Sequence, residues 1–116
     1  MKSIKLSEKI CCDDIIRCIY EFNDLDIKVF KELKKIGESR ANFLANKLQR
    51  ERSTIYRSLQ KLTSCGLCIK KSNKIKSGGY YHTYFCNDIK IVKKKVDACV
   101  DNWYNTMKNT IKVFDI

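Results

Sequence analysis

The stretch from Arg52 to Leu62 carries a row of polar side chains at a spacing that could bind a nucleic acid. Within it Ile55, Leu59 and Leu62 recur at the spacing of one helix face, which predicts a helix with that side buried. At about 100° per residue, the opposite side and its flanks carry Ser53, Thr54, Tyr56, Arg57, Gln60, Lys61 and Ser64. Every one of these side chains can donate a hydrogen bond. Donors on an exposed helix face can meet the acceptors on base edges and phosphates.

The shape of each side chain suggests its role on such a face. Arg57 is the best candidate for a base contact, because its forked guanidinium matches the two acceptors of a guanine. Gln60 could read an adenine or reach only a phosphate. The alternative is an ordinary solvated helix face. The other candidates for DNA contacts on this helix, most of them suited to phosphates, are Arg52, Ser53, Thr54, Tyr56 and Lys61.

The cysteines form a second group that could do chemistry. Cys65 and Cys68 have the CxxC spacing of half a zinc site, but a structural zinc site needs four ligands and no second pair of this kind exists. In the alternative interpretation Cys68 is a small core side chain and Cys65 ends a helix. We favour this packing interpretation, and we expect no metal and no cofactor. Further cysteines and the lone histidine that could complete a site are Cys11, Cys12, Cys18, Cys86, Cys99 and His82.

The remaining residues give no support to enzyme chemistry. The chain has no phosphate-binding glycine loop, and a single histidine leaves few choices for acid–base catalysis. The aspartates stand at predicted helix starts or on polar faces. We therefore expect a binding protein and not an enzyme.

The charge of the whole chain favours a polyanionic partner. Its 116 residues, which fit one domain, carry a net charge of +11. Nucleic acid is the first candidate and an anionic membrane surface the second, whereas a solvated lysine-rich surface is the alternative. No apolar run approaches the roughly 18 residues of a membrane span, and the first residues lack an apolar signal core. We therefore expect a cytoplasmic protein without a membrane partner.

Helical spacing also predicts the elements that precede the polar helix. Asn23-Asp24 separates the first two helices and could cap the second, which Gly37 ends. Gln49-Arg50-Glu51 is a tight turn, so the two short helices that it joins make a helix-turn-helix. The predicted helices and their buried residues are 13–22 (Ile15, Ile16, Ile19, Phe22), 25–36 (Val29, Phe30, Leu33, Ile36) and a third from Ser39 (Phe43, Leu44, Leu48).

The segment after the helix-turn-helix has the pattern of a β-hairpin. Leu67–Lys71 and Tyr80–Phe85 are typical of strands, and Gly78-Gly79 between them indicates a turn. A hairpin in this place is a wing. Lysines on a wing can reach the DNA backbone or the flanking minor groove, although a solvated turn also favours lysine. The phosphate candidates outside the polar helix are Lys74 and Lys76 on the wing and Arg40 near the start of the third helix.

One long helix is predicted from Asp88 to about Val113. Residues 13–86 already supply a core, so a further apolar stripe of this length suggests a helix that packs on a second subunit. We therefore predict a homodimer through residues 88–114. The stripe steps by three and four along Ile89, Val92, Val96, Cys99 and Trp103, and it then shifts to Met107, Ile111 and Phe114.

Several pieces of the sequence carry a family resemblance: Asp24–Phe30, Leu44–Leu48, Arg52–Leu62 and Gly66-Leu67. Across residues 20–33 and 41–67 the chain resembles archaeal winged helix-turn-helix regulators of the TrmB-like group, and MarR-like and ArsR-like groups have similar runs. The resemblance implies DNA binding and dimerisation. It does not imply a sugar ligand, because family members bind sugars in a large C-terminal effector domain and this chain ends too soon for one.

These patterns predict a mainly α fold with a small β-hairpin, a winged helix-turn-helix with a long C-terminal dimerisation helix, as one domain over residues 1–116. We expect a homodimeric regulator of transcription that binds specific double-stranded DNA with its recognition helix in the major groove. One alternative is a winged-helix subunit that contacts proteins, such as the basal transcription machinery or a chromatin assembly, or binds nonspecific DNA. Another is a metal- or redox-responsive repressor that uses Cys65 and Cys68.

Overall fold

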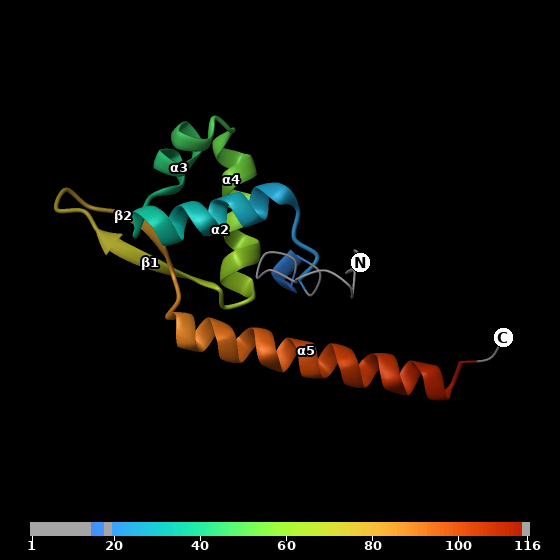
Figure 1. The fold of residues 1–116 in the computed structure, drawn as a ribbon. Coiled ribbons are helices and arrows are strands. Elements are labelled where there is room, and N and C mark those ends of the chain that lie inside the picture. The colour runs from blue at the N-terminus through green and yellow to red at the C-terminus, as the bar shows by residue number, and fades with distance from the viewer. Residues whose placement is uncertain (1–14, 18–19, 115–116) are drawn as a thin grey trace.

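The computed structural model describes residues 15–17 and 20–114. Its fold is mainly helical, with a two-stranded antiparallel hairpin and a long last helix, as the sequence predicts. Of the predicted first helix, residues 15–17 are helical, whereas Asp13, Asp14 and Ile19 lie outside the described residues. The elements are α2 (Asp24–Ile36), α3 (Ala41–Leu48), α4 (Arg52–Ser64), β1 (Cys68–Lys74), β2 (Tyr80–Cys86) and α5 (Ile89–Lys112) (Figure 1).

Local hydrogen bonds define both ends of α2. Asn23 Oδ1 accepts a hydrogen bond from the Asp26 backbone N at 2.8 Å, and Asp26 Oδ2 accepts one from the Asn23 backbone N at 3.0 Å. This reciprocal capping box satisfies two backbone donors that the fold would otherwise leave open. Gly37 ends the helix at a φ of 86°, a region that glycine enters without steric cost. The predicted cap and the predicted stop are confirmed.

The prediction for the start of α3 is wrong. The helix begins at Ala41 and not at Ser39. The Ser39 backbone instead pairs with Tyr84 of β2, through hydrogen bonds of 2.9 and 2.8 Å. This bridge ties the segment before the helix-turn-helix to the wing.

The predicted inner face of α3 is also wrong in one residue. Phe43 is 53% exposed, and the buried face consists of Ala41, Leu44 and Ala45, with Leu48 half-buried. These four positions follow the i, i+3, i+4, i+7 spacing of one stripe, and Phe43 lies about 100° away from Leu44. The two alanines are small enough to let the helix approach its neighbours closely, as their size suggests from the sequence.

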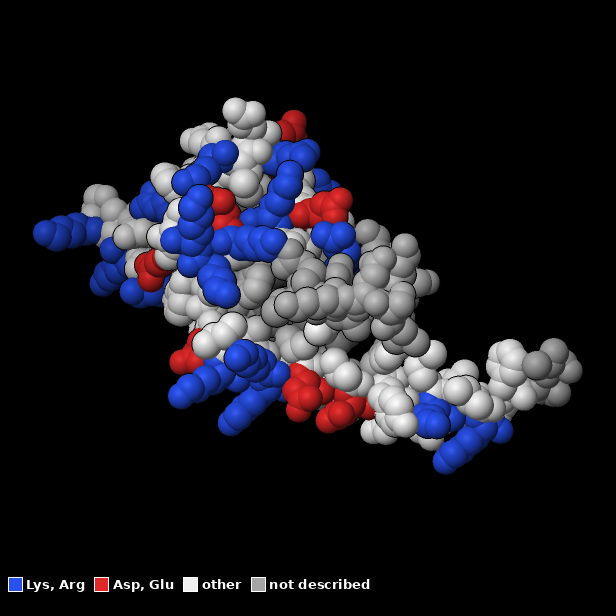
Figure 2. Space-filling view, in the orientation of Figure 1, with Lys and Arg blue, Asp and Glu red and all other residues white. Residues whose placement is uncertain are grey.

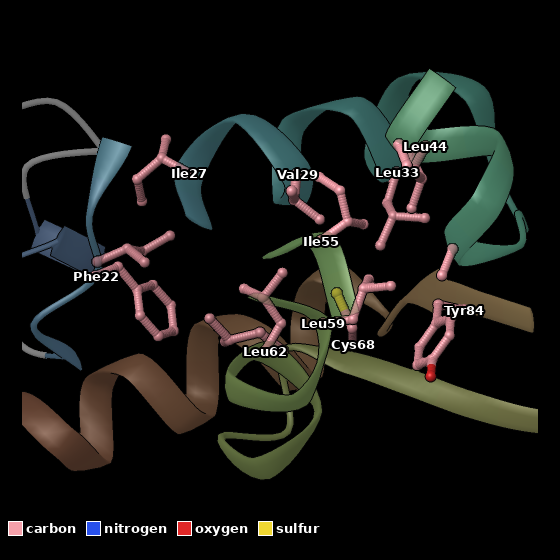
Figure 3. Close-up of a cluster of buried hydrophobic side chains, with 14 of the residues drawn as sticks. Phe22, Ile27, Val29, Leu33, Leu44, Ile55, Leu59, Leu62, Cys68 and Tyr84 are labelled. Carbon is pink, nitrogen blue, oxygen red and sulfur yellow. The ribbon is translucent and has the colours of Figure 1, made fainter. Parts of the chain in front are cut away.

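The core lies between α2, α4 and the hairpin (Figure 3). Ile55, Leu59 and Leu62 of α4 are fully buried, as predicted. Cys68 is buried among them, which agrees with the packing interpretation of this cysteine. The other main core residues are Phe22, Ile27, Val29, Leu33, Leu44, Leu67, Tyr84 and Val92.

The hairpin is longer than predicted, because β1 continues to Lys74. The register pairs Cys68 with Cys86 at the base and Lys74 with Tyr80 near the tip. Gly78-Gly79 lies in the turn, and both residues have a positive φ, of 104° and 84°. A turn of this kind favours glycine, so the predicted turn is confirmed.

α5 extends well beyond the winged-helix body, by which we mean residues 20–87 (Figure 1). Asp88 caps it by accepting a hydrogen bond from the Lys90 backbone N at 2.8 Å. The helix has 24 residues and gives the described molecule a length of 63 Å against 28 and 25 Å in the other directions. Val92 is 5% exposed, whereas every residue from Asp101 to Phe114 is exposed. None of the described helices has the length and apolarity of a membrane span.

Candidate nucleic-acid interface

α4 presents the predicted polar face to solvent. The buried stripe that begins at Ile55 fixes the inner side of the helix, so Arg57 and Gln60 lie exposed on the other side. Ser58, on the inner side, is buried. Arg52, Ser53 and Tyr56 are exposed near the helix start, and Thr54 is half-buried on the flank. These residues thus lie on the predicted side of α4, while their contacts with DNA stay a prediction.

A buried carboxylate attaches α4 to α2. Asp26 is 1% exposed, and its oxygens accept hydrogen bonds from Ser58 Oγ at 2.6 Å and Lys61 Nζ at 2.7 Å. Charge-assisted hydrogen bonds to an ionised carboxylate are the strong class, and here they fix the rotation of α4 on its neighbour. Lys61 therefore has a partner within the chain, and its predicted DNA contact stays a prediction.

The sequence patterns do not reveal the role of Asp26. The spacing of Asn23 and Asp26 signals a capping box, which explains the backbone contacts at the start of α2. The partners on α4 are 32 and 35 residues away along the chain, and no local pattern indicates them.

Side-chain contacts hold the wing against the start of the helix-turn-helix. The Arg40 guanidinium lies 3.7 Å from the centre of the Tyr81 ring, in a cation–π contact. Thr83 Oγ1 donates to Glu38 Oε2 at 2.9 Å and accepts from Asn73 Nδ2 at 3.0 Å. The predicted phosphate candidate Arg40 is thus held between the start of α3 and the wing.

The tip of the wing is exposed and basic. Lys74 ends β1 and Lys76 lies in the turn, and both are exposed. Lys70 and Tyr80 are also exposed on the hairpin, although the sequence patterns did not single them out. His82 is an exposed residue of β2, and its Nδ1 lies 3.1 Å from Ser72 Oγ.

The start of α4 lies beside the wing. Burial raises the pKa of Tyr84 on β2, the neighbouring Tyr56 raises it further, and Arg52 lowers it. The structure therefore groups Arg52 and Tyr56 with the wing strand, while Lys61 at the other end of the helix faces α2. Together α4 and the wing make one surface that can present hydrogen-bond donors and positive charge to an anionic polymer.

The cysteines of the CxxC motif have weakly acidic thiols. Burial raises the pKa of Cys65. A hydrogen bond with Cys86 raises the pKa of Cys68 and lowers that of Cys86. Since the thiolate is the reactive form, Cys65 and Cys68 lack the usual features of a reactive site. Among the described residues, no group of three or more His, Cys, Asp or Glu side chains could hold a metal ion.

The predicted dimerisation stripe divides into two halves on α5. In the first half Val92 is buried, Val96 is half-buried against the core, and Cys99 Sγ donates to Tyr20 Oη at 3.4 Å. These residues pack on the winged-helix body of the same chain, although Ile89 at the helix start is half exposed. The residues of the second half, beyond the body, are exposed: Trp103, Met107, Ile111 and Phe114.

Sequence comparison with known proteins identifies a family. The family model described as "Sugar-specific transcriptional regulator TrmB" matches residues 16–90. The uncharacterized protein MJ1503 of Methanocaldococcus jannaschii is 33% identical over 100 residues, which cover 86% of this chain and 76% of that protein. The uncharacterized protein MJ1082 of the same organism is 27% identical over 107 residues, covering 92% of this chain and 88% of that protein.

Solved structures share the fold at low sequence identity. A possible transcriptional regulator from Methanosarcina mazei Go1 has a TM-score of 0.79 at 18% identity, covering 98% of this chain and 97% of that one. The ST1889 protein from Sulfolobus tokodaii has a TM-score of 0.68 at 20% identity, and the match covers 82% of this chain and 93% of that one. An ArsR-like transcriptional regulator from Rhodococcus sp. RHA1 has a TM-score of 0.51 at 17% identity, and the match covers 87% of this chain and 91% of that one. With the family match over most of the chain, the protein belongs to the TrmB family of transcriptional regulators and is a DNA-binding regulator of the winged-helix type.

Proposed function

We propose that this regulator is a homodimer that recognises specific sequences in double-stranded DNA by placing α4 in the major groove. The observation that carries the proposal is the exposed face of α4, where the residues around Arg57 and Gln60 are hydrogen-bond donors next to a basic wing. A surface for a protein partner would favour exposed aliphatic and aromatic side chains in this place. The net charge of +11 adds the sequence-independent attraction to phosphates.

The residues divide by the kind of contact that each can make. Arg57 reads a guanine through two parallel hydrogen bonds, and Gln60 reads an adenine or contacts the backbone. Lys61 serves mainly to hold α4 on α2, because its ammonium is bound to Asp26. Contacts to phosphates position the protein without reading sequence. We assign them to Arg40, Arg52, Ser53, Thr54 and Tyr56 around α4 and to Lys74 and Lys76 on the wing.

The homodimer forms through the second half of α5. Met107 and Ile111 are exposed on a helix that has no other part of the described chain beneath it at this point. A second copy of the same helix would cover this apolar surface. Two copies that pair in this way present two copies of α4, as a two-fold symmetric DNA site requires.

Selection of binding sites from a pool of random duplexes tests the proposal. The protein should enrich a motif with two-fold symmetry, whose half-sites lie about one helical turn apart or a multiple of it. Duplex binding without any enriched motif would favour a nonspecific DNA-binding role. A protein that binds no duplex at all would favour the alternative of a protein-interaction subunit.

A further inference from the structure

A cavity of about 410 Å³ lies between α2 and α5. Its walls are mainly apolar, with Phe30 from α2 on one side and Val92, Val96 and Val100 from α5 on the other. The volume falls within the range of about 300–1,000 Å³ that is typical of small-molecule sites. No described residue that lines the cavity is among the proposed DNA contacts, so it forms a separate site.

The edge of this cavity carries positive charge. Lys31 and Lys34 from α2 and Lys93 from α5 line it, and Asp97 is the acidic residue among its described lining residues. Within the described ranges, neither Lys34 nor Lys93 forms an ion pair. Figure 2 shows basic side chains over α2 and over the first turns of α5.

We propose that the α2–α5 cavity binds a small hydrophobic organic anion, a carboxylate on an aromatic or aliphatic body. The body loses contact with water when it fills the space between Phe30 and the valines. The carboxylate stays at the edge, where Lys34 or Lys93 gives it a charge-assisted hydrogen bond.

Other occupants fit the walls less well. A sugar would place hydroxyl groups against the aliphatic and aromatic side chains, where they find few hydrogen-bond partners. Inorganic phosphate has no apolar body to fill the cavity. The proposed dimer surface lies farther along α5, beyond Val100, so a second copy does not need this space.

Calorimetric titration of the full chain with 2-naphthoate tests the proposal, and it is independent of any DNA. We expect saturable binding at one site per chain, weaker binding of the neutral analogue 2-naphthylmethanol, and none of inorganic phosphate. Val100→Trp fills the cavity from an exposed helix position and should lower the affinity for 2-naphthoate about tenfold or more. Lys93→Gln should lower the affinity for 2-naphthoate severalfold and leave the affinity for 2-naphthylmethanol unchanged. The matched control Lys108→Gln should change neither affinity.

Three outcomes would overturn the proposal. The first is the absence of saturable binding by 2-naphthoate, and the second is equal affinity for the charged and the neutral probe. The third is undiminished binding by a Val100→Trp variant that keeps the wild-type circular dichroism spectrum, because the probe would then bind elsewhere. If wild-type protein binds no probe and Val100→Trp changes the mass measured by light scattering, the cavity belongs to an interface between copies.

Discussion

Asp26 shows how one side chain determines the orientation of the recognition surface. Its carboxylate accepts a hydrogen bond from the Asn23 backbone N at the start of α2 and also binds Ser58 and Lys61 on α4. A carboxylate with 1% exposure has lost almost all of its hydration, so these partners must replace the water. The exposed face of α4 therefore depends on a residue that does not belong to that face.

Replacement of this carboxylate should be costly. We expect Asp26→Ala to lower the free energy of unfolding by about 2–3 kcal/mol, because Ser58, Lys61 and the backbone N–H of Asn23 lose their acceptor. Urea denaturation measures the change. The matched control is Asp24→Ala. Asp24 forms an ion pair with Arg17 at 2.9 Å, but its side chain is 78% exposed, so its loss should lower the free energy of unfolding by less than about 1 kcal/mol. Equal losses in the two variants would contradict this account of Asp26.

At the scale of residues, the sequence predicts which side of a helix a residue occupies, but it does not predict contacts between residues far apart in the chain. Arg57 and Gln60 could be placed on the outer side of α4 because helical geometry relates each of them to the stripe that contains Leu59. The contact of Arg40 with Tyr81 could not be predicted, since it joins two elements whose relative position depends on the complete fold. The same is true of the Asp26 partners.

The turn between α3 and α4 contains a strained residue. Gln49 has a φ of 54° in the left-handed region, where a side chain crowds the following carbonyl group. The Arg50 backbone N donates to Ala45 O at 2.9 Å across the same turn, so the backbone cannot easily relax. The turn holds the two helices of the helix-turn-helix in their relative orientation.

Glycine should relieve the strain at this turn. We expect Gln49→Gly to raise the free energy of unfolding by up to about 1 kcal/mol, as the steric cost disappears and part of the gain is offset by backbone entropy. Gln60→Gly, within α4, is the control and should lower it by about 0.5–1 kcal/mol. Thermal and urea denaturation measure both changes in the free energy of unfolding, the increase in Gln49→Gly and the decrease in Gln60→Gly. A loss of stability in both variants would show that Gln49 makes a compensating contact.

At the scale of elements, a continuous apolar spacing made prediction accurate. α4 and α5 match their predicted extents within a residue or two, because each has apolar residues at regular helical spacing between clear start and stop positions. α3 is short and relies on small alanines, so the pattern placed Phe43 wrongly. The end of β1 was missed because Ser72, Asn73 and Lys74 have little intrinsic preference for a strand, and pairing with the aromatic β2 extends it.

The whole molecule should be a dimer in solution. Light scattering at micromolar concentration should give about twice the 13.6 kDa of one chain. Met107→Glu should yield monomers, because it places a charge in the centre of the exposed apolar surface of α5 while it leaves the winged-helix body intact. Asn102→Glu, on the same helix but away from the stripe, should remain a dimer. A monomeric wild-type protein would contradict the proposed assembly.

The charge of the whole molecule and the face of α4 make different contributions to DNA binding. Positive charge attracts every duplex and weakens with salt, whereas base contacts discriminate between duplexes. Lys76→Ala on the wing should therefore lower the affinity for specific and scrambled duplexes by similar factors and make the salt dependence shallower.

The most direct test of sequence reading by α4 compares Arg57→Ala with the wild type and with Lys76→Ala. Each protein is titrated with a selected site and with a scrambled duplex at several salt concentrations. We predict that Arg57→Ala costs about 1–3 kcal/mol on the selected site and removes discrimination at one base pair in each half-site. If Arg57→Ala weakens both duplexes equally, Arg57 contacts only phosphate. If the wild type shows no preference between the duplexes, the central claim of sequence-specific recognition is wrong.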